Sequence, residues 1–214
     1  MELPGRTGLL SLGAAAAIGL AAPVFTAGAA AAVSGWTVMP GGPFTAKAGT
    51  TTLKDTRSGA TLTCASSTGK GTLKSGSGLP GAGIGTVTSL TFNGCAGPLG
   101  LTFTVRGRFP WKINFSTWNA SNGGVVGGTI SGIHATLSAP GCSAVVDGTG
   151  PSADNGTVKI TYTNSTARLA VLTTGGNLHL YKVSGCAGLI SSNDPVTFGG
   201  SYAVTPRQMI HPST

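Results

Sequence analysis

The sequence predicts an all-β protein, built as an antiparallel sandwich or barrel of about a dozen short strands and held by two disulfides. One observation is that no window places apolar residues at sustained three- and four-residue intervals, which is the pattern of a helix. A second is that short runs rich in Thr and Val alternate with clusters of Gly, Asn and Pro, as in strands and turns. A third is the even number of cysteines, four, behind an export-type N-terminus. This pattern leaves sandwich and barrel both open.

The N-terminal residues 1–32 have the layout of a secretory signal peptide. Arg6 supplies an early positive charge, and the uncharged stretch LLSLGAAAAIGLAAPVF is followed by small residues in Ala-x-Ala patterns. A membrane anchor needs roughly 20 predominantly apolar residues, but the Ala and Gly content of this segment favours cleavage over anchoring. We therefore expect an exported mature chain, residues 33–214, that forms a single all-β domain without an integral membrane span.

The first strands are expected between residues 35 and 64. The runs GWTVMP and PFTAKAG are short and extended. The segment TTTLKDTRSGATLTC places two Thr-rich runs around an Arg-Ser-Gly turn, which predicts a hairpin over residues 50–64. The Gly-rich segment 70–85 that follows predicts a long loop or an irregular edge strand.

Alternating runs follow from residue 85 onward. Residues 85–95 are expected to turn Val87 to one face and Leu90 and Phe92 to the other. The apolar members of PLGLTFTVRGRF and PWKINFSTWN alternate with polar ones, which indicates half-buried strands. The remaining predicted strands form a meander, and they lie in VVGGTISGIHATLSAPGC, CSAVVDG, GTVKITYTN, ARLAVLTT, NLHLYKVSG and VTFGGSYAVTP.

Two of the four cysteines share one local sequence, Gly-Cys-Ala-Gly, in FNGCAGPL around Cys95 and VSGCAGLI around Cys186. Each lies downstream of another cysteine, Cys64 or Cys142. A duplicated half that closes its own bridge predicts the pairs Cys64–Cys95 and Cys142–Cys186, each worth about 3–4 kcal/mol. The lack of a Cys-x-x-Cys motif argues against a zinc site. The same repeat divides the domain into two related halves, about 36–110 and 111–206.

The predicted mature chain is strongly basic. Outside Glu2 and Arg6 it has 12 Lys and Arg, four Asp and no Glu, so its net charge is +8. Such a surface attracts polyanions, here cell-wall polymers or glycans. Nucleic-acid binding is not expected, because the basic residues are dispersed rather than gathered in a patch. One stretch, RGRFPWKINFSTW, brings cations and aromatic rings together as a candidate surface-binding site. Its residues are Arg106, Arg108, Trp111, Lys112 and Trp118.

The chain lacks the usual equipment of a hydrolase. Glycoside hydrolysis normally takes two carboxylates, and the four Asp lie in turn-like sequences where Asp typically closes a turn. Ser is abundant and His134 and His179 lie in predicted strands, so a Ser-His-Asp triad stays open. No Gly-x-Ser-x-Gly nucleophile elbow accompanies them. We predict a non-enzymatic protein with no catalytic residue, cofactor or metal site.

Three segments carry a resemblance to a known group of proteins. WTVMPGGPFTAKAGTTTLKDTRSGATLTCASS, GTLKSGSGLPGAGIGTVTSLTFNGCAGPLGLTFTV and GNLHLYKVSGCAGLISSNDPVTFGGSYAV resemble small secreted proteins of streptomycete-type actinobacteria. The similarity covers most of the mature chain, and the group carries no assigned activity. The resemblance implies export and an all-β fold, and it transfers no catalytic residue.

Together these features predict an exported, non-enzymatic β-domain, secreted or held at the cell surface, that binds wall polymers. One alternative is a carrier of a small apolar ligand, since abundant Gly and Ala can leave a cavity inside a barrel or between sheets. The other alternative is a secreted hydrolase. It requires His134 or His179 within hydrogen-bond reach of a Ser and an Asp in a cleft.

Overall fold

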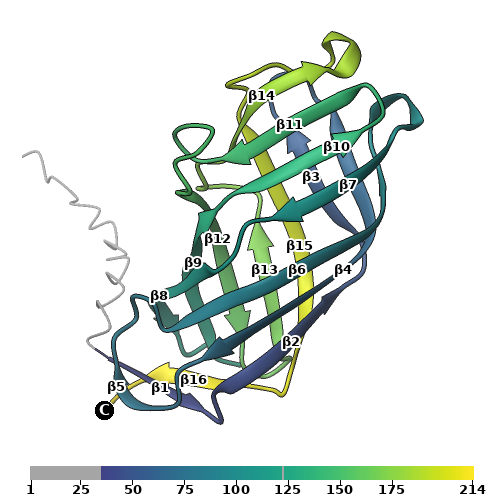
Figure 1. Cartoon of the computed structure of the whole chain (residues 1–214). Coiled ribbons are helices and arrows are strands. Elements are labelled where there is room, and N and C mark those ends of the chain that lie inside the picture. Colours follow the sequence, from purple (N-terminus) through teal and green to yellow (C-terminus); the bar gives the residue numbers. More distant parts are fainter. Residues whose placement is uncertain (1–34, 122) are drawn as a thin grey trace, which may run out of the picture.

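A closed antiparallel β-barrel forms most of the structure (Figure 1). The computed structural model describes residues 35–121 and 123–214, so the predicted signal peptide, residues 1–32, lies outside the described residues. Within those ranges, no helix is long and apolar enough to cross a membrane. The elements follow in this order: β1 (Trp36–Met39), β2 (Gly42–Ala48), β3 (Thr51–Asp55), β4 (Thr61–Leu73), β5 (Gly76–Leu79), β6 (Gly85–Ala96), the 3-10 turn η1 (Pro98–Gly100), β7 (Thr102–Gly107), β8 (Trp111–Asn119), β9 (Val125–Ile133), β10 (Ala135–Ala139), β11 (Cys142–Asp147), β12 (Gly156–Thr163), β13 (Arg168–Leu172), β14 (His179–Gly185), the 3-10 turn η2 (Cys186–Gly188), β15 (Val196–Thr205) and β16 (Met209–Pro212).

The barrel closes because each long strand pairs with the next one along the chain and the last pairs with the first. β15 pairs with β2 along its C-terminal half and with β3 along its N-terminal half, and β4 pairs with β6. Five couples of strands lie end to end, so each couple acts as one interrupted strand: β2 with β3, β7 with β8, β9 with β10, β11 with β12, and β13 with β14. With β4, β6 and β15 they make an eight-stranded up-and-down barrel. The predicted fold class is confirmed, and of its two forms the structure shows the barrel.

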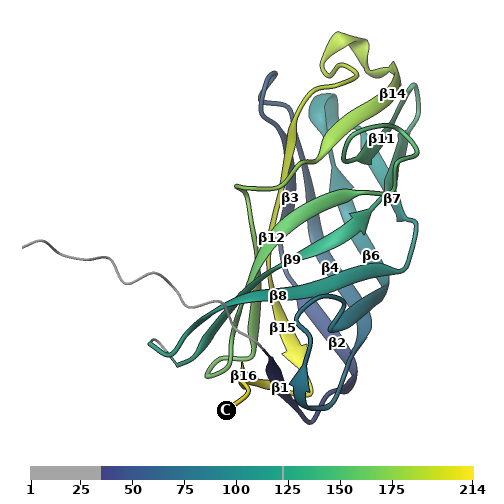
Figure 2. The same cartoon turned by 90° about the vertical axis from the view of Figure 1, so that its left-hand side faces the viewer.

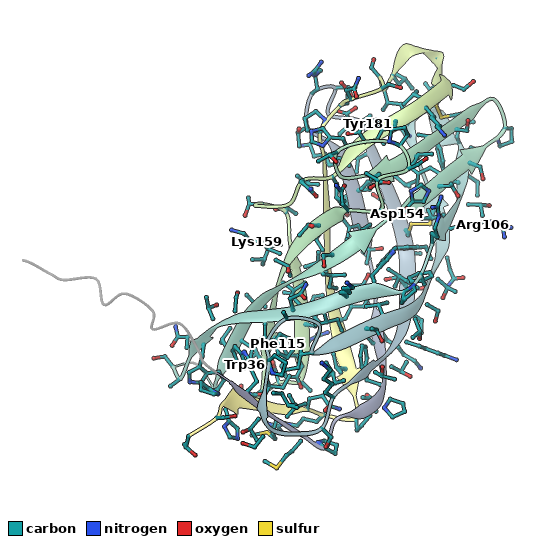
Figure 3. The ribbon with its side chains drawn as sticks, turned by 60° about the vertical axis from the view of Figure 1, so that its left-hand side comes forward. Trp36, Arg106, Phe115, Asp154, Lys159 and Tyr181 are labelled. Carbon is teal, nitrogen blue, oxygen red and sulfur yellow. A yellow bond between two sulfur atoms is a disulfide. The ribbon has the colours of Figure 1, made fainter. Side chains whose placement is uncertain are left out.

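The two ends of the barrel are covered differently. At one end, called the sheet end, β1, β5 and β16 form a small antiparallel sheet (Figure 2). Trp36, Ile84 and Ile210 are at most 1% exposed there. The Trp36 ring meets Phe115 edge-on, with centroids 5.5 Å apart (Figure 3). The opposite end, called the loop end, carries the turns that contain η1 and η2.

A β-bulge corrects one detail of the sequence prediction. Val87 was expected on the face opposite to Leu90 and Phe92. The register between β4 and β6 shifts between Lys70 and Gly71, and a bulge inserts one extra residue into a strand. Val87 is therefore buried in the same core against which Leu90 and Phe92 pack. β8 alternates as predicted, with its three inward apolar residues buried.

The predicted hairpin over residues 50–64 is present as β3 and β4. The Gly-rich segment 70–85 was expected to form a long loop or an irregular edge strand. It contains β5, which is an edge strand of the small sheet with an irregular register. Sixteen strands are present among the described residues rather than about a dozen. The difference arises because β5 and β16 were not among the predicted runs, and because the run VVGGTISGIHATLSAPGC holds two strands, β9 and β10.

Both predicted disulfides are present, Cys64–Cys95 and Cys142–Cys186. The first joins neighbouring strands β4 and β6, and the second joins the start of β11 to η2. The glycine before each repeated cysteine has a conformational reason, because Gly94 has φ 59° and Gly185 has φ 70°. Gly adopts this left-handed region without the steric cost of a Cβ. Each bridge lies within its own predicted half, and the division into two related halves stays a prediction.

Candidate functional site

An apolar cavity of about 80 Å³ lies inside the barrel, on the side of the loop end. Strands from all around the barrel contribute to its wall, and every lining side chain except Thr51 is apolar. Phe92 and Phe198 meet edge-to-face within this wall, with centroids 5.9 Å apart. Trp111 turns its indole inward from the start of β8. The cavity is thus shaped by hydrocarbon and aromatic groups.

A second apolar cavity, of about 50 Å³, continues the first toward the loop end. The two share Leu53, Leu62 and Leu137 as lining residues. The second reaches residues of η1 and η2, and its wall includes one acid, Asp55. A buried water needs two to four polar partners, so an apolar cavity of this kind stays dry. The interior therefore offers space that suits an apolar molecule.

A network of four polar side chains, called the brace, ties together the interruptions of three long strands. Arg108 lies between β7 and β8, His134 lies between β9 and β10, Asp147 ends β11, and Asp154 precedes β12. His134 Nδ1 lies 2.9 Å from Asp147 Oδ2 and 3.2 Å from Asp154 Oδ1. Arg108 Nη1 donates to Asp154 Oδ2 at 2.9 Å. Figure 3 shows Asp154 about midway along the barrel.

The position of Arg108 fixes the proton on His134. Arg108 Nη2 lies 3.3 Å from His134 Nε2. Because a guanidinium can only donate hydrogen bonds, Nε2 is the acceptor. Nδ1 therefore carries the ring hydrogen and donates it to Asp147. With both ring nitrogens engaged, His134 has no lone pair for a metal, although its ligand atom and those of Asp147 and Asp154 lie within 4.8 Å of one another. Arg108 also occupies the position at Nε2 where a triad needs a Ser hydroxyl.

Hydrogen bonds satisfy the buried charge of Asp147. Burial alone raises the pKa of this carboxyl. Hydrogen bonds from His134 and from the backbone N–H groups of Gly148, Asp154 and Asn155 outweigh that effect and hold its pKa below the usual value. Asp147 thereby fixes the loop between β11 and β12 against the barrel wall. The brace has the properties of a structural element beside the cavity rather than of a reactive centre.

The structure separates the residues of the predicted surface-binding site. Arg106, Arg108 and Lys112 point outward and are exposed, whereas Trp111 is 6% exposed and lines the cavity. Trp118 is half-buried and packs against the core. Neighbouring residues of a strand face opposite sides, which explains why Trp111 and Lys112 diverge. A role of the three cations in surface binding stays a prediction.

Arg108 and Lys112 come together in a groove on the outer wall, with a volume of about 550 Å³. Phe109, Ser131, Asp154 and Thr157 also line this groove, and Asp154 pairs with Arg108. The groove therefore combines two cations and one acid with hydroxyl groups and one aromatic ring. Lys112 supplies its net positive charge, which favours a polar, anionic partner.

Positive and negative side chains are distributed unevenly between surface and interior. All twelve Lys and Arg of residues 35–214 are exposed. Asp55, Asp147 and Asp194 are at most 3% exposed. Asp154 is the one exposed acid in the described ranges, and it pairs with Arg108. The charged side chains of the outer wall are therefore almost all cationic.

Sequence reasoning missed the brace. His134 was considered only as a triad member, and Asp147 and Asp154 only as turn residues. The segment GIHATL has the alternation of an ordinary strand, with Ile133, Ala135 and Leu137 on one face, and only the structure shows that His134 is buried beside them. A buried histidine needs polar partners nearby, and these come from a distant loop. The cavity itself has no local sequence signal, since its walls come from strands that are distant along the chain.

Comparison with known protein families identifies a match over most of the chain. A family model described as "Alkane oxidation protein activator PraA/PraB-like" matches residues 10–210. The matched range includes all of the barrel and reaches into β16. No curated protein and no solved structure shows a significant match to the chain.

Proposed function

Because the chain belongs to the alkane oxidation protein activator PraA/PraB-like family, we propose that it is an exported carrier that binds a hydrocarbon inside its barrel. The observation that supports this function is the apolar cavity of about 80 Å³ inside the barrel, continued by a second of about 50 Å³. Together the two approach the roughly 150 Å³ of an engineered cavity that accommodates benzene. The proposed ligand is a short alkane or one end of a longer one.

A carrier activates oxidation by raising the amount of substrate that is available in water. An alkane has no polar group, and exposing each of its CH₂ units to water costs about 0.8 kcal/mol of free energy. A dry cavity lined by Leu, Ile, Val and Phe side chains recovers this free energy. The proposal assigns no chemical step to this chain, and it leaves the oxidation to another protein.

The proposal places the protein outside the cytoplasm, secreted or at the cell surface. The pairing of all four cysteines in disulfides supports this placement, since such bridges form and persist in oxidising compartments. The signal peptide expected over residues 1–32 and the resemblance to small secreted proteins of streptomycete-type actinobacteria point the same way. Both stay predictions.

Solution NMR of the full chain with dissolved n-hexane tests the carrier function. We expect saturable shifts at residues that line both cavities, Leu53, Leu62 and Leu137, and none at the exposed Lys112. The unfolding midpoint should rise with hexane concentration, because a ligand that binds only the folded state stabilises it. Shifts that do not saturate, or that spread over the outer wall, would contradict interior binding.

A second function, the binding of polyanionic wall polymers, is favoured by the cationic outer wall and its groove. The affinity of the full chain for a purified teichoic acid should fall steeply with salt concentration. Lys112→Gln should weaken binding more than Lys47→Gln, which removes another exposed cation three strands away around the barrel. Binding that is indifferent to salt and to Lys112 would rule out this function for the groove.

A further inference from the structure

Two turns at the loop end carry the same sequence feature. In each, the repeated Gly-Cys-Ala-Gly segment, at 94–97 and at 185–188, is followed directly by apolar residues. These residues form a surface that we call the apolar rim: Pro98, Leu99, Leu101, Leu189 and Ile190. Four of the five line the second cavity, so the two turns lie side by side over it. The second turn follows β14 at the top of Figure 1. The segments that the two disulfides hold thus present apolar side chains at one end of the barrel.

Leu99 is the most exposed large apolar residue among those that the structure describes, at 73%. It also has φ 57°, in the left-handed region that a leucine side chain disfavours. The turn does not depend on this side chain, because its hydrogen bonds join backbone groups. The N–H of Gly97 donates to Leu101 O at 2.8 Å, and that of Leu101 donates to Pro98 O at 3.2 Å. Leu99 therefore costs free energy in hydration and in backbone conformation, and such an outlier indicates a binding role.

The apolar rim continues the lining of the interior to the outer surface. Leu53, Leu62 and Leu137 line both cavities, and the apolar rim borders the second. At the sheet end, by contrast, the interior is covered by the small sheet, whose Trp36 is 1% exposed. The apolar lining of the barrel therefore reaches the outer surface at the loop end.

Three exposed cations lie at the loop end beside the apolar rim. Lys54 lies near the end of β3, Arg57 in the turn from β3 to β4, and Lys182 in β14. Lys182 adjoins the turn that contains η2, because the N–H of the next residue, Val183, donates to Ser192 Oγ at 3.1 Å. Lys54 and Lys182 form no ion pair within residues 35–121 and 123–214. Both ammonium groups are therefore free to meet an anionic partner.

The acids of the loop end are buried. Asp55 and Asp194 are 3% and 2% exposed, and Asp194 Oδ1 lies 3.3 Å from Arg57 Nε. Asp154, the one exposed acid of the described ranges, lies about midway along the barrel (Figure 3). The exposed charges around the apolar rim are therefore all positive. A second copy of this chain would bring cations against cations. A lipid surface with anionic headgroups offers negative charge and hydrocarbon together.

We propose that the apolar rim docks onto a lipid surface that carries anionic headgroups. Leu99 enters the boundary between headgroups and acyl chains, while Lys54 and Lys182 stay among the headgroups. In this orientation the second cavity faces the hydrocarbon of the lipid. Uptake of an alkane from that hydrocarbon rests on the proposed function, whereas docking is tested without any alkane.

Co-sedimentation of the full chain with vesicles tests the apolar contact. The vesicles consist of phosphatidylcholine with or without phosphatidylglycerol, and residues 1–34 are the same in every protein compared. Leu99→Asn should lower the affinity for the anionic vesicles by about tenfold, because it removes a buried leucine side chain. The fold should be kept, since Asn tolerates a left-handed φ. The matched control is Met209→Gln, at a 44% exposed position of the sheet end, and its affinity should be unchanged. Equal binding of Leu99→Asn and the wild type overturns the proposal.

The same assay tests the charged contact. Lys54→Gln and Lys182→Gln should each weaken binding about fivefold, as expected for a cation near an anionic lipid surface. The control Lys74→Gln removes an exposed cation next to β5 at the sheet end and should change nothing. Arg57 is kept in these proteins because Asp194 pairs with it. Equal affinity for vesicles of phosphatidylcholine alone overturns the choice of an anionic surface.

NMR in bicelles that contain a spin-labelled lipid tests the orientation. The amide signals of Leu99 and Leu189 should lose intensity, whereas that of Met209 at the opposite end should keep it. Loss at both ends alike overturns docking through the apolar rim. Sedimentation without lipid tests the other occupant, a second copy of the chain. The wild type should be monomeric, and a dimer that Leu99→Asn dissociates overturns the lipid surface as the partner.

These results are separable from the proposed function. If vesicles bind through Leu99 but n-hexane shifts no residue of the cavities, the carrier function fails and docking stands. If n-hexane binds inside the barrel but vesicle binding does not depend on Leu99, docking is overturned and the carrier function stands.

Discussion

Filling the cavity at Ala135 tests the proposed ligand site most directly. Ala135 begins β10, lines the cavity, and faces Gly107 and Val146 on the neighbouring strands. An empty cavity of about 80 Å³ destabilises the fold by about 2 kcal/mol, at about 24 cal/mol per Å³. Ala135→Leu adds three carbon atoms at this place, worth about 0.8 kcal/mol each when buried. We expect the free energy of unfolding to rise by up to about 2 kcal/mol.

Urea unfolding with and without n-hexane measures both consequences. A ligand at 100 times its Kd stabilises the wild-type chain by about 2.7 kcal/mol, and Ala135→Leu should lose this gain because the added side chain occupies the same space. Ala203→Leu is the matched control, since it makes the same change on an exposed position of β15. It should leave the gain from hexane intact.

The opposite outcome is equally clear. A solid interior leaves no room for the added carbons, and overpacking of this kind destabilises by about 1–3 kcal/mol. If Ala135→Leu is less stable than the wild type and still gains stability from hexane to the same extent, the cavity is not the binding site. The carrier function would then lose the observation that supports it.

Two further predictions concern the framework of the barrel. Replacing Cys142 and Cys186 by Ser opens a loop of 44 residues and should lower the free energy of unfolding by about 4 kcal/mol, seen as a lower urea midpoint. An unchanged midpoint would show that the bridge does not stabilise the fold. Asp147→Asn should destabilise by about 1–3 kcal/mol at neutral pH, because buried donors lose a charged acceptor. Folding lowers the pKa of Asp147, so its stabilising effect is present above the unfolded pKa of 3.8 and disappears as pH falls through the folded pKa. In acid unfolding experiments, the free energies of unfolding of the wild type and of Asp147→Asn should therefore converge. A difference that persists at the lowest pH would contradict this account.

Local chemistry made the disulfides predictable from the sequence. The repeated Gly-Cys-Ala-Gly setting indicated which cysteines were equivalent, and each partner lay upstream in the same half. The structure gives the setting a physical reason, because Gly94 and Gly185 both have positive φ immediately before the bridged cysteine. The positions of most barrel strands followed from their Thr- and Val-rich, alternating runs, since the side-chain period of two is a local property. The run that forms β16 was not predicted.

Closure of the barrel was not predictable in the same way. It depends on β15 returning to β2 and β3, more than a hundred residues away along the chain. The prediction of which face Val87 occupies was wrong for a related reason. A bulge in the pairing of β6 with β4 shifts the alternation of side chains within a run that looks regular in the sequence. The inward turn of Trp111 follows from alternation, but only closure shows that this inner face lines a cavity.

Aromatic rings lie toward both ends of this barrel, so the cavity depends on the side chains between them. An eight-stranded barrel is just wide enough for its side chains to fill it or to enclose one small ligand. Toward the sheet end, Trp36 meets Phe115 and Tyr162 donates to Gln208 O. Burial raises the pKa of Tyr202 to about 12, as expected for a phenol that is removed from water. Around the cavity, Phe92, Trp111 and Phe198 share the wall with Leu, Ile, Val and Ala side chains, and this mixture leaves the cross-section partly empty.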